Sequence, residues 1–307
     1  MLAKSSSSFF NLPVALDTNG SREERILGMR QDHTIHTHWK SLDDHSLSKP
    51  SLLDLFANNI PLVRERNFLS DEECNAMHEI LLTHKIGIYN IDHVWPKVGC
   101  VGISQTDYTK DKDTYFGRVE KARSLQDRWK AEAGVDIMDR IAGSLRKATG
   151  LPVRLATEGD REYFAGVVRA LDSGIQIHAD YAPFEGANWE IGRIAAQISW
   201  NILINKIPGG DTYIYDREWR APQDDLTFRK EFPKYAYDPQ IVQGRAFKVM
   251  SARRGDLTIF NSRNFHEVRA CDIPKGERDI PVRYTVSSFI GYLPGQGEDP
   301  ATLVLWS

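Results

Sequence analysis

The sequence predicts an α+β protein in which helices precede a β-rich core. Apolar residues at helical spacing, preceded by capping residues, occupy residues 70–82 and 124–149. From about Glu162 onward, short runs of β-branched and aromatic residues alternate with turn residues. Strands that are this short and this closely spaced favour an all-β sandwich or barrel over a parallel sheet.

The composition is typical of a soluble globular protein. Hydrophobic residues make up 41% and charged residues 26% of the 307 residues. The net charge of −3 gives no preference for nucleic acid, and no apolar run is long enough to span a membrane. Three widely spaced cysteines and a poor signal peptide at the N-terminus predict a reducing, cytoplasmic location.

Changes in composition along the chain predict the domain organisation. Residues 1–50 are polar and predict an irregular N-terminal arm, and residues 51–307 predict a single domain. Within that domain we expect a helical lead-in at 62–150 and a β core at 160–293. An insertion at 216–245, rich in aromatic and charged residues, has the length of segments that often act as lids.

The lead-in begins with a short strand at 62–68 that enters a helix. Ser70 is the expected N-cap, and Glu73 stands where a capping box needs it. Acidic residues in the first turn favour the positive end of the helix dipole. The apolar face of this helix is expected to contain Met77, Ile80 and Leu81.

A second helix is predicted over residues 124–149. Gly150 and Pro152 end it, because neither residue continues a helix readily. Its inward face is expected to contain Trp129, Ile137, Ile141 and Leu145.

Seven segments of the C-terminal half have the composition of strands. A turn at 261–265 is expected to lead from the sixth of them to His266. The predicted strands cover residues 163–171, 175–178, 195–205, 212–215, 247–250, 257–260 and 284–292.

A metal-binding pattern lies on these strands. Residues i and i+2 of a strand face the same way, so His178 and Asp180 can point into one cavity. His266 can reach the same metal from a neighbouring strand. Two histidines and one carboxylate on one face of an octahedron leave three positions free, which suits Fe(II). His-x-Asp alone is common, so the order of the surrounding segments carries the argument.

That order resembles a known family. Residues 163–292 resemble the core of the Fe(II)/2-oxoglutarate-dependent dioxygenases, and residues 62–81 resemble the lead-in of the prolyl-hydroxylase-like branch. The resemblance implies a double-stranded β-helix core (jelly-roll, cupin-like) with flanking N-terminal helices. Three segments resemble microbial and fungal members that tailor amino acids and secondary metabolites, some of which are halogenases: ISWNILINKIPGGDTYIYD, RRGDLTIFNSRNFHEV and VRYTVSSFIGYLP.

The resemblance also implies residue roles. His178, Asp180 and His266 are expected to hold Fe(II). Arg283 is expected to bind the distal carboxylate of 2-oxoglutarate through its planar fork, and Thr285 adds a hydroxyl from the same strand face. Arg283 lies slightly farther from His266 than is usual in the family. The rival arginines are Arg278, which lies in a polar loop, and Arg269, which lies close to His266.

Two further residues are candidates for the co-substrate site. Arg169 could reach a carboxylate of the substrate or co-substrate, or it could be a surface charge on an edge strand. Asn201 and Trp200 alternate on the next strand, so only one of them can face the cavity. Asn201 is the expected lining residue, because a buried amide needs a partner.

The resemblance implies an enzyme that uses Fe(II), 2-oxoglutarate and O2 and releases succinate and CO2. The expected reaction is hydroxylation of an unactivated C–H bond of a small molecule, with desaturation, epimerisation or ring closure left open. Halogenating members carry a small residue in place of the metal-binding carboxylate, so Asp180 predicts no halogenation. The alternatives are a protein or peptide substrate and a cupin-type isomerase or metal-binding module, which would not need Arg283. Exposed aromatic residues could serve a homodimer interface.

Overall fold

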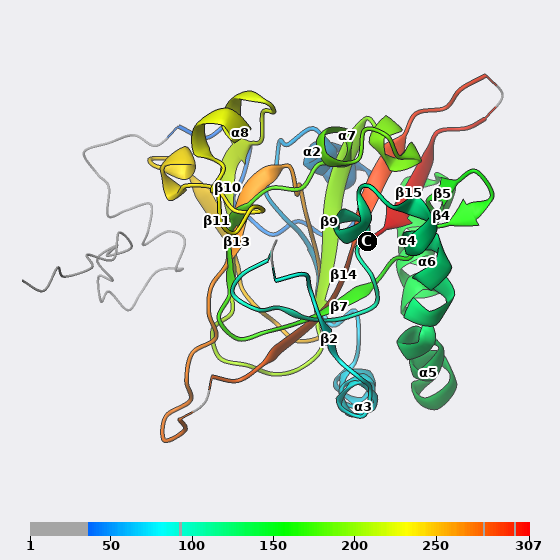
Figure 1. The fold of residues 1–307 in the computed structure, drawn as a ribbon, viewed down its shortest axis with the longest axis vertical. Helices are drawn as coiled ribbons and strands as arrows, with labels where there is room; N and C mark the ends of the chain where they lie inside the picture. Colours follow the sequence, from blue (N-terminus) through cyan, green and yellow to red (C-terminus); the bar gives the residue numbers. More distant parts are fainter. Residues whose placement is uncertain (1–35, 92–93, 279, 298) are drawn as a thin grey trace, which may run out of the picture. The chain divides into compact units, whose positions relative to one another are not determined.

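The computed structural model describes residues 36–91, 94–278, 280–297 and 299–307. Thr37–Ser307 forms one compact unit, so residues 37–50 of the expected arm belong with the domain (Figure 1). Thr37 Oγ1 donates a hydrogen bond to Asp216 Oδ2 at 2.6 Å. Helix α2 (Lys49–Phe56) begins two residues before the expected domain boundary. Residues 1–35 of the expected arm lie outside the described residues.

A large, mostly antiparallel sheet forms one half of the core. Strand β15 extends it beside β14 and pairs in parallel with β4. The order of the main path is β1 (Val63–Glu65), β12 (Leu257–Phe260), β9 (Ala196–Leu203), β14 (Arg283–Leu293), β7 (Val167–Leu171), β3 (Gly99–Val101) and β2 (Gly87–Ile88). The added strands are β15 (Thr302–Trp306) and β4 (Val153–Leu155).

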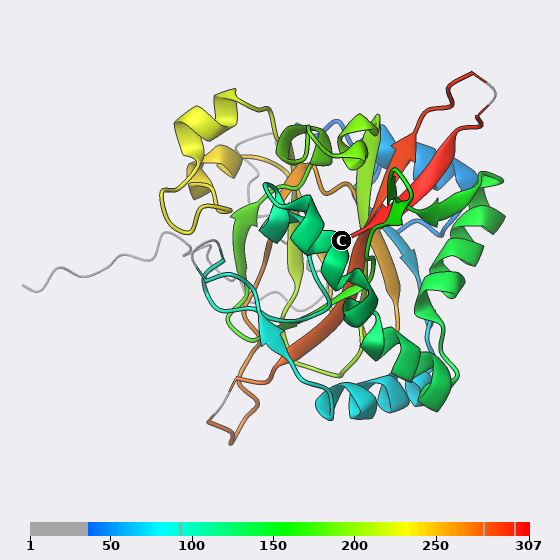
Figure 2. The same cartoon turned by 45° about the vertical axis from the view of Figure 1, so that its right-hand side comes forward.

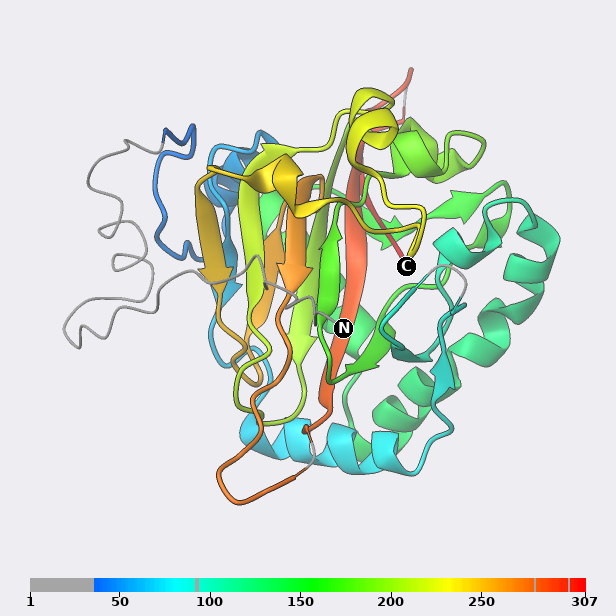
Figure 3. The same cartoon turned by 60° about the vertical axis from the view of Figure 1, so that its left-hand side comes forward.

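A smaller four-stranded sheet lies against one face of the large sheet, and helices lie beyond the other face of the large sheet (Figure 3). Its strand order is β11 (Phe247–Met250), β10 (Thr212–Glu218), β13 (Asn264–Val268) and β8 (Ile175–His178). A separate hairpin consists of β5 (Thr157–Glu158) and β6 (Arg161–Glu162). The predicted α+β organisation is therefore confirmed.

Side-chain alternation on strand β9 separates the core from the cavity between the sheets. Ile198, Trp200 and Ile202 pack into the apolar core with the helices. Ser199 and Asn201 point to the opposite face, because neighbouring residues of a strand alternate. The same strand therefore contributes to stability on one face and to a polar cavity on the other.

Helices α3 (Asp71–Leu82), α5 (Ser124–Ala133) and α6 (Ile137–Thr149) cover the large sheet (Figures 1 and 2). Trp129 is fully buried and donates a hydrogen bond from Nε1 to the Met77 carbonyl at 2.9 Å. Further α-helices are α4 (Lys112–Ala122), α7 (Ala182–Glu185) and α8 (Gln223–Phe228). Three short 3-10 helices of the described residues are η1 (Gln105–Tyr108), η2 (Glu190–Arg193) and η3 (Pro239–Val242).

The single helix predicted at 124–149 is two helices, so that prediction was wrong. Gly134 adopts φ +70 and ends α5, and the Asp136 side chain accepts a hydrogen bond from the Asp139 amide and begins α6. A glycine in the left-handed conformation ends a helix, and an N-cap residue begins one. Helix α5 therefore ends and helix α6 begins within three residues. The expected inward residues Ile137, Ile141 and Leu145 are nevertheless buried.

The predicted capping box at α3 is confirmed. Ser70 accepts a hydrogen bond from the Glu73 amide at 3.1 Å, and Glu73 Oε2 accepts one from the Ser70 amide at 2.9 Å. Ser70→Ala is expected to lower the free energy of unfolding by about 1 kcal/mol, because it removes a side-chain cap. Ser124→Ala is the control, since no side-chain cap is present at α5. Denaturant unfolding measures both; equal effects would contradict the cap assignment.

The insertion at 216–245 packs against the small sheet. Its first residues continue β10, and the Tyr237 amide donates a hydrogen bond to the Ile177 carbonyl of β8 at 2.9 Å. Trp219 and Tyr237 are buried, whereas Phe232 is exposed.

The described residues contain no helix that meets the length and hydropathy needed to cross a membrane.

Candidate active site

Strands β8 and β13 bring the two predicted histidines side by side. His178 is the last residue of β8, and it is the register partner of His266 in the middle of β13. The turn predicted at 261–265 is shorter, because β13 already begins at Asn264. This strand pairs on both sides, with β10 and with β8. Asn264 and Glu267 have weak strand propensity, so pairing stabilises the strand where its own residues do not.

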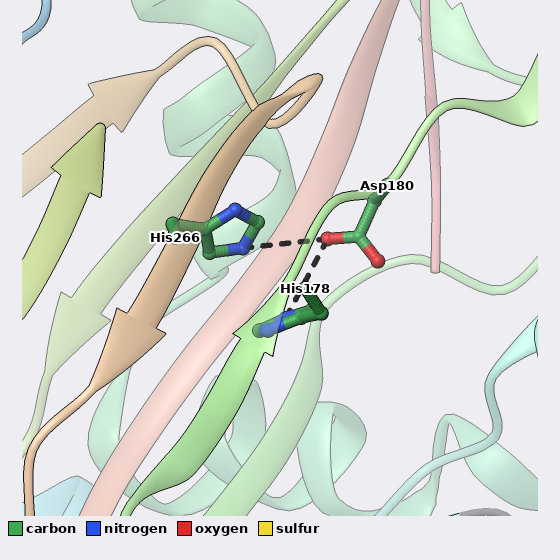
Figure 4. Close-up of side chains that lie close together, drawn as sticks. All are labelled: His178, Asp180 and His266. Carbon is green, nitrogen blue, oxygen red and sulfur yellow. Dashed lines mark ion pairs between the residues drawn. The ribbon is translucent and has the colours of Figure 1, made fainter. Parts of the chain in front are cut away.

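The three predicted metal ligands converge on one point (Figure 4). Asp180 Oδ2 lies 3.5 Å from His266 Nε2 and 4.0 Å from His178 Nε2. One donor atom from each of the three residues lies within 4.8 Å of the others. Among the described residues, no other group of three or more His, Cys, Asp or Glu side chains meets this criterion.

Hydrogen bonds fix the same tautomer in both histidines. His178 Nδ1 lies 2.8 Å from the Gln176 carbonyl oxygen, and His266 Nδ1 lies 2.8 Å from the Asn264 carbonyl oxygen. A carbonyl only accepts, so each Nδ1 carries the proton and each Nε2 presents a lone pair. In metal sites, a hydrogen bond from the ring nitrogen that does not bind the metal commonly orients the imidazole in this way.

The backbone of Asp180 is held in place from two sides. Its amide donates to the Ser262 carbonyl at 2.9 Å, and its carbonyl accepts from Gln197 Nε2 at 3.2 Å and Ser262 Oγ at 3.3 Å. These bonds leave the carboxylate free to face the histidines (Figure 4).

Burial shifts the pKa values of His266 and Asp180. Burial lowers the pKa of His266 well below its usual value, and His178 lowers it further. Burial raises the pKa of Asp180, while His178 and Arg169 favour its ionised form. A neutral imidazole is the form that binds a metal, and the donor set of two imidazoles and a carboxylate fits Fe(II).

A cavity of about 80 Å³ opens beside these side chains, between the two sheets. Arg283 and Thr285 line it from β14, and Arg283 Nη1 donates to Thr285 Oγ1 at 3.3 Å. Asn201 lines it from β9, whereas Trp200 packs with the helices, as the alternation predicted. The cavity is therefore bounded by the possible metal ligands and by Arg283.

Arg283 is buried without a carboxylate to neutralise it. Its exposed fraction is 5%, it forms no ion pair with any described residue, and its Nε has no hydrogen-bond partner there. Burial lowers the pKa of Arg283 to about 10, so it stays protonated at neutral pH. A buried cation of this kind is costly unless an anion joins it.

The turn before β10 makes room for Arg283. Gly210 has φ +72, and a Cβ there would lie 3.1 Å from Arg283 Cδ and 2.9 Å from Ile207 Cδ1. Glycine tolerates both the backbone conformation and the close approach. Pro208, Gly209 and Gly210 are typical turn residues, but nothing in the sequence indicates the link to Arg283.

The rival arginines lie elsewhere. Arg278 is exposed, and Arg269 forms an ion pair with Glu267 at 2.8 Å. Arg169 lines the cavity, donates to Ser287 Oγ and lies over the ring of Tyr89. It is therefore not a free surface charge on an edge strand.

Several residues that line the cavity were not predicted. Ser199 shares a strand face with Asn201, and Phe289 shares one with Thr285, so alternation could have found both. Glu185, on the short helix α7, lines a second cavity that also reaches His178 and Asp180. Burial, with the charge of Asp180 in addition, raises the pKa of Glu185 to about 8. No sequence pattern marks Glu185.

A family model described as the carrier-protein-independent halogenase WelO5 matches residues 38–297. The chain belongs to this family. It is an Fe(II)/2-oxoglutarate-dependent oxygenase, as the sequence predicted, and it uses Fe(II), 2-oxoglutarate and O2. The WelO5 match includes His178, Asp180, His266 and Arg283, and it covers the strands of both sheets except β15.

Two curated relatives accompany the family match. Leucinostatins biosynthesis cluster protein S from Purpureocillium lilacinum is 44% identical over 221 residues, which cover 71% of this chain and 89% of that protein. L-gamma-glutamyl-L-propargylglycine hydroxylase from Streptantibioticus cattleyicolor is 25% identical over 288 residues, which cover 89% of this chain and 99% of the hydroxylase.

A solved structure supports the fold. The N-substituted L-amino acid dioxygenase from Burkholderia ambifaria, in complex with alpha-ketoglutarate, superposes with a TM-score of 0.54 and 13% identity. The match covers 84% of this chain and 90% of the dioxygenase. The predicted double-stranded β-helix is confirmed.

Proposed function

We propose that this WelO5-family oxygenase hydroxylates an unactivated C–H bond of an amino-acid-derived or secondary metabolite, with release of succinate and CO2. The observation that carries the proposal is the convergence of His178, Asp180 and His266 at a cavity that also contains the unneutralised Arg283. Three ligands on one side leave room for a chelating co-substrate and for dioxygen.

Each residue has a distinct role in this proposal. His178, Asp180 and His266 hold Fe(II) through Nε2, Oδ2 and Nε2. Arg283 binds the distal carboxylate of 2-oxoglutarate, and Thr285 adds a hydrogen bond to it. Arg169 and Asn201 line the rest of the co-substrate cavity. When bound, Fe(II) supplies the chemistry by which dioxygen and 2-oxoglutarate oxidise the substrate C–H bond.

Asp180 favours hydroxylation over halogenation. The family model is named for a halogenase, and halogenating enzymes of this kind need a small residue where chloride binds. In this chain a carboxylate occupies that position and faces both histidines (Figure 4). The chloride position is therefore filled by a side chain.

A small-molecule substrate is favoured over a protein side chain. The cavity beyond the proposed iron has a volume of about 120 Å³. Trp219 and Tyr237, which could have formed the wall of a peptide groove, are buried in the core. The relatives named above are an L-gamma-glutamyl-L-propargylglycine hydroxylase and a protein of the leucinostatins biosynthesis cluster, and the first of them agrees with an amino-acid-derived substrate.

The experiment is a succinate-release assay with Fe(II), 2-oxoglutarate, air and a panel of amino acids and small peptides, in the presence and absence of chloride. We expect substrate-dependent succinate and a product 16 mass units heavier, one oxygen atom, with no chlorinated product. Mass spectrometry reads both outcomes. A chlorinated product would contradict the role of Asp180, and the absence of succinate with every compound of the panel would contradict the proposed amino-acid-derived substrate.

A further inference from the structure

A second cavity lies next to the proposed iron, on the side away from Arg283. It shares His178, Asp180, Arg169 and Phe289 with the co-substrate cavity, but Arg283 and Thr285 line only the latter. A molecule in the second cavity would therefore contact the proposed iron ligands without occupying the position of the co-substrate. This is where a substrate C–H bond has to lie.

Glu185 is the ionisable residue that this cavity adds to those it shares with the co-substrate cavity. It ends helix α7, and Glu185 Oε2 accepts a hydrogen bond from the Tyr181 amide at 3.3 Å. No ion pair links it to a Lys, Arg or His among the described residues. Arg229 has a favourable charge interaction with it, but Arg229 is already bound to Asp225 at 3.1 Å and to Tyr237.

The remaining walls are largely apolar. Val94, Val98, Ile175 and Phe289 line the cavity together with the rings of Tyr89 and Tyr235. Tyr89 is buried, and the Tyr235 hydroxyl is already engaged with the Gln176 amide at 3.0 Å. The cavity thus places the carboxyl groups of Glu185 and Asp180 beside mostly apolar walls, with Arg169 on the side that it shares with the co-substrate cavity.

We propose that Glu185 binds a basic nitrogen of the substrate, so that the substrate is an amine with a short aliphatic or aromatic body. This inference rests on the proposed function, since it places the amine beside the Fe(II) site. The ammonium group would lie against Glu185 and the hydrocarbon group against Val98 and Phe289. One of its C–H bonds would then face His178 and Asp180.

The physical reason is the cost of an isolated charge. A carboxylate that is removed from water without a cation is destabilised, and an ammonium ion that joins it forms a charge-assisted hydrogen bond. Loss of one partner of such a pair weakens binding strongly, because the remaining charge is left buried without a partner. N-acylation of the substrate removes both the positive charge and a donor, so it should have a comparable effect.

The test compares paired compounds in the succinate assay: L-leucine methyl ester, 2-phenylethylamine and L-valyl-L-leucine, each with its N-acetyl derivative. In the wild type, we expect the free amines to stimulate succinate release and N-acetylation to lower the response at least tenfold. In Glu185→Gln, which has nearly the same shape, the response to the amines should fall at least tenfold and the difference within each pair should disappear. Glu190→Gln, an exposed carboxylate on η2, is the matched control and should respond like the wild type.

Equal stimulation by both members of a pair would overturn the proposal. So would an undiminished response of Glu185→Gln to the amines, or no response of the wild type to any amine. The visible charge-transfer band of the anaerobic wild-type Fe(II)–2-oxoglutarate complex is measured first. Absence of that band refutes the proposed function itself, whereas a band without an amine response refutes only the role of Glu185.

Discussion

Asp180→Ala is expected to abolish turnover, because it removes one of three proposed iron ligands and leaves the two imidazoles alone. Loss of an outer partner of a metal ligand costs about 10- to 100-fold in metal affinity or activity, and loss of a ligand itself should cost more. The carboxylate lies within 4.0 Å of both Nε2 atoms, and among the described residues no further His, Cys, Asp or Glu belongs to this group. Succinate release and Fe(II) binding are the measurements.

Asp172→Ala is the matched control for this prediction. Asp172 follows β7, its carboxylate contacts Ser173, and it lines neither cavity. We expect near wild-type turnover from it, which separates loss of a ligand from loss of a negative charge near β8. Full turnover by Asp180→Ala with normal Fe(II) content would contradict the assignment.

Arg283→Lys is expected to raise the KM for 2-oxoglutarate about 10- to 100-fold while kcat at saturating co-substrate falls much less. Lysine keeps the charge but loses the planar fork, and hydrogen bonds to charged groups contribute about 1.5–3 kcal/mol. Arg283 lines the cavity with no described anion bound to it, so a ligand carboxylate is its natural partner.

Arg278→Lys makes the same chemical change at an exposed arginine of the loop before β14. Steady-state assays over a range of 2-oxoglutarate concentrations should leave its KM unchanged. If Arg278→Lys raised the KM and Arg283→Lys did not, the distal carboxylate would have to bind at the loop rather than inside the cavity.

The parts of the fold that the sequence predicted are those with a strong local signal. The capped helix α3 and strands β8, β11 and β12 lie where capping residues and apolar runs placed them. Strand β13 was missed because its residues, Asn-Phe-His-Glu-Val, follow turn residues and form a strand only through pairing on both sides. Strand β15 was missed although it is a continuous apolar run.

The candidate site was predicted to the extent that strand alternation determines it. Asp180 lies two residues beyond the end of β8, so strand alternation alone does not place it beside His178. Arg283 and Thr285 lie two residues apart on β14, so they could be grouped without coordinates. Glu185 could not, because its position depends on how a four-residue helix returns toward the metal ligands. The absence of a counter-ion for Arg283 also depends on tertiary packing.

The most direct test of this account is anomalous diffraction from anaerobic crystals grown with Mn(II), as a redox-inert substitute for Fe(II), and 2-oxoglutarate. The account predicts one metal peak per chain, within direct coordination distance of His178 Nε2, Asp180 Oδ2 and His266 Nε2. The co-substrate should chelate that metal and extend its distal carboxylate to Arg283. A metal bound elsewhere, or one at this position that Asp180 does not contact, would contradict it.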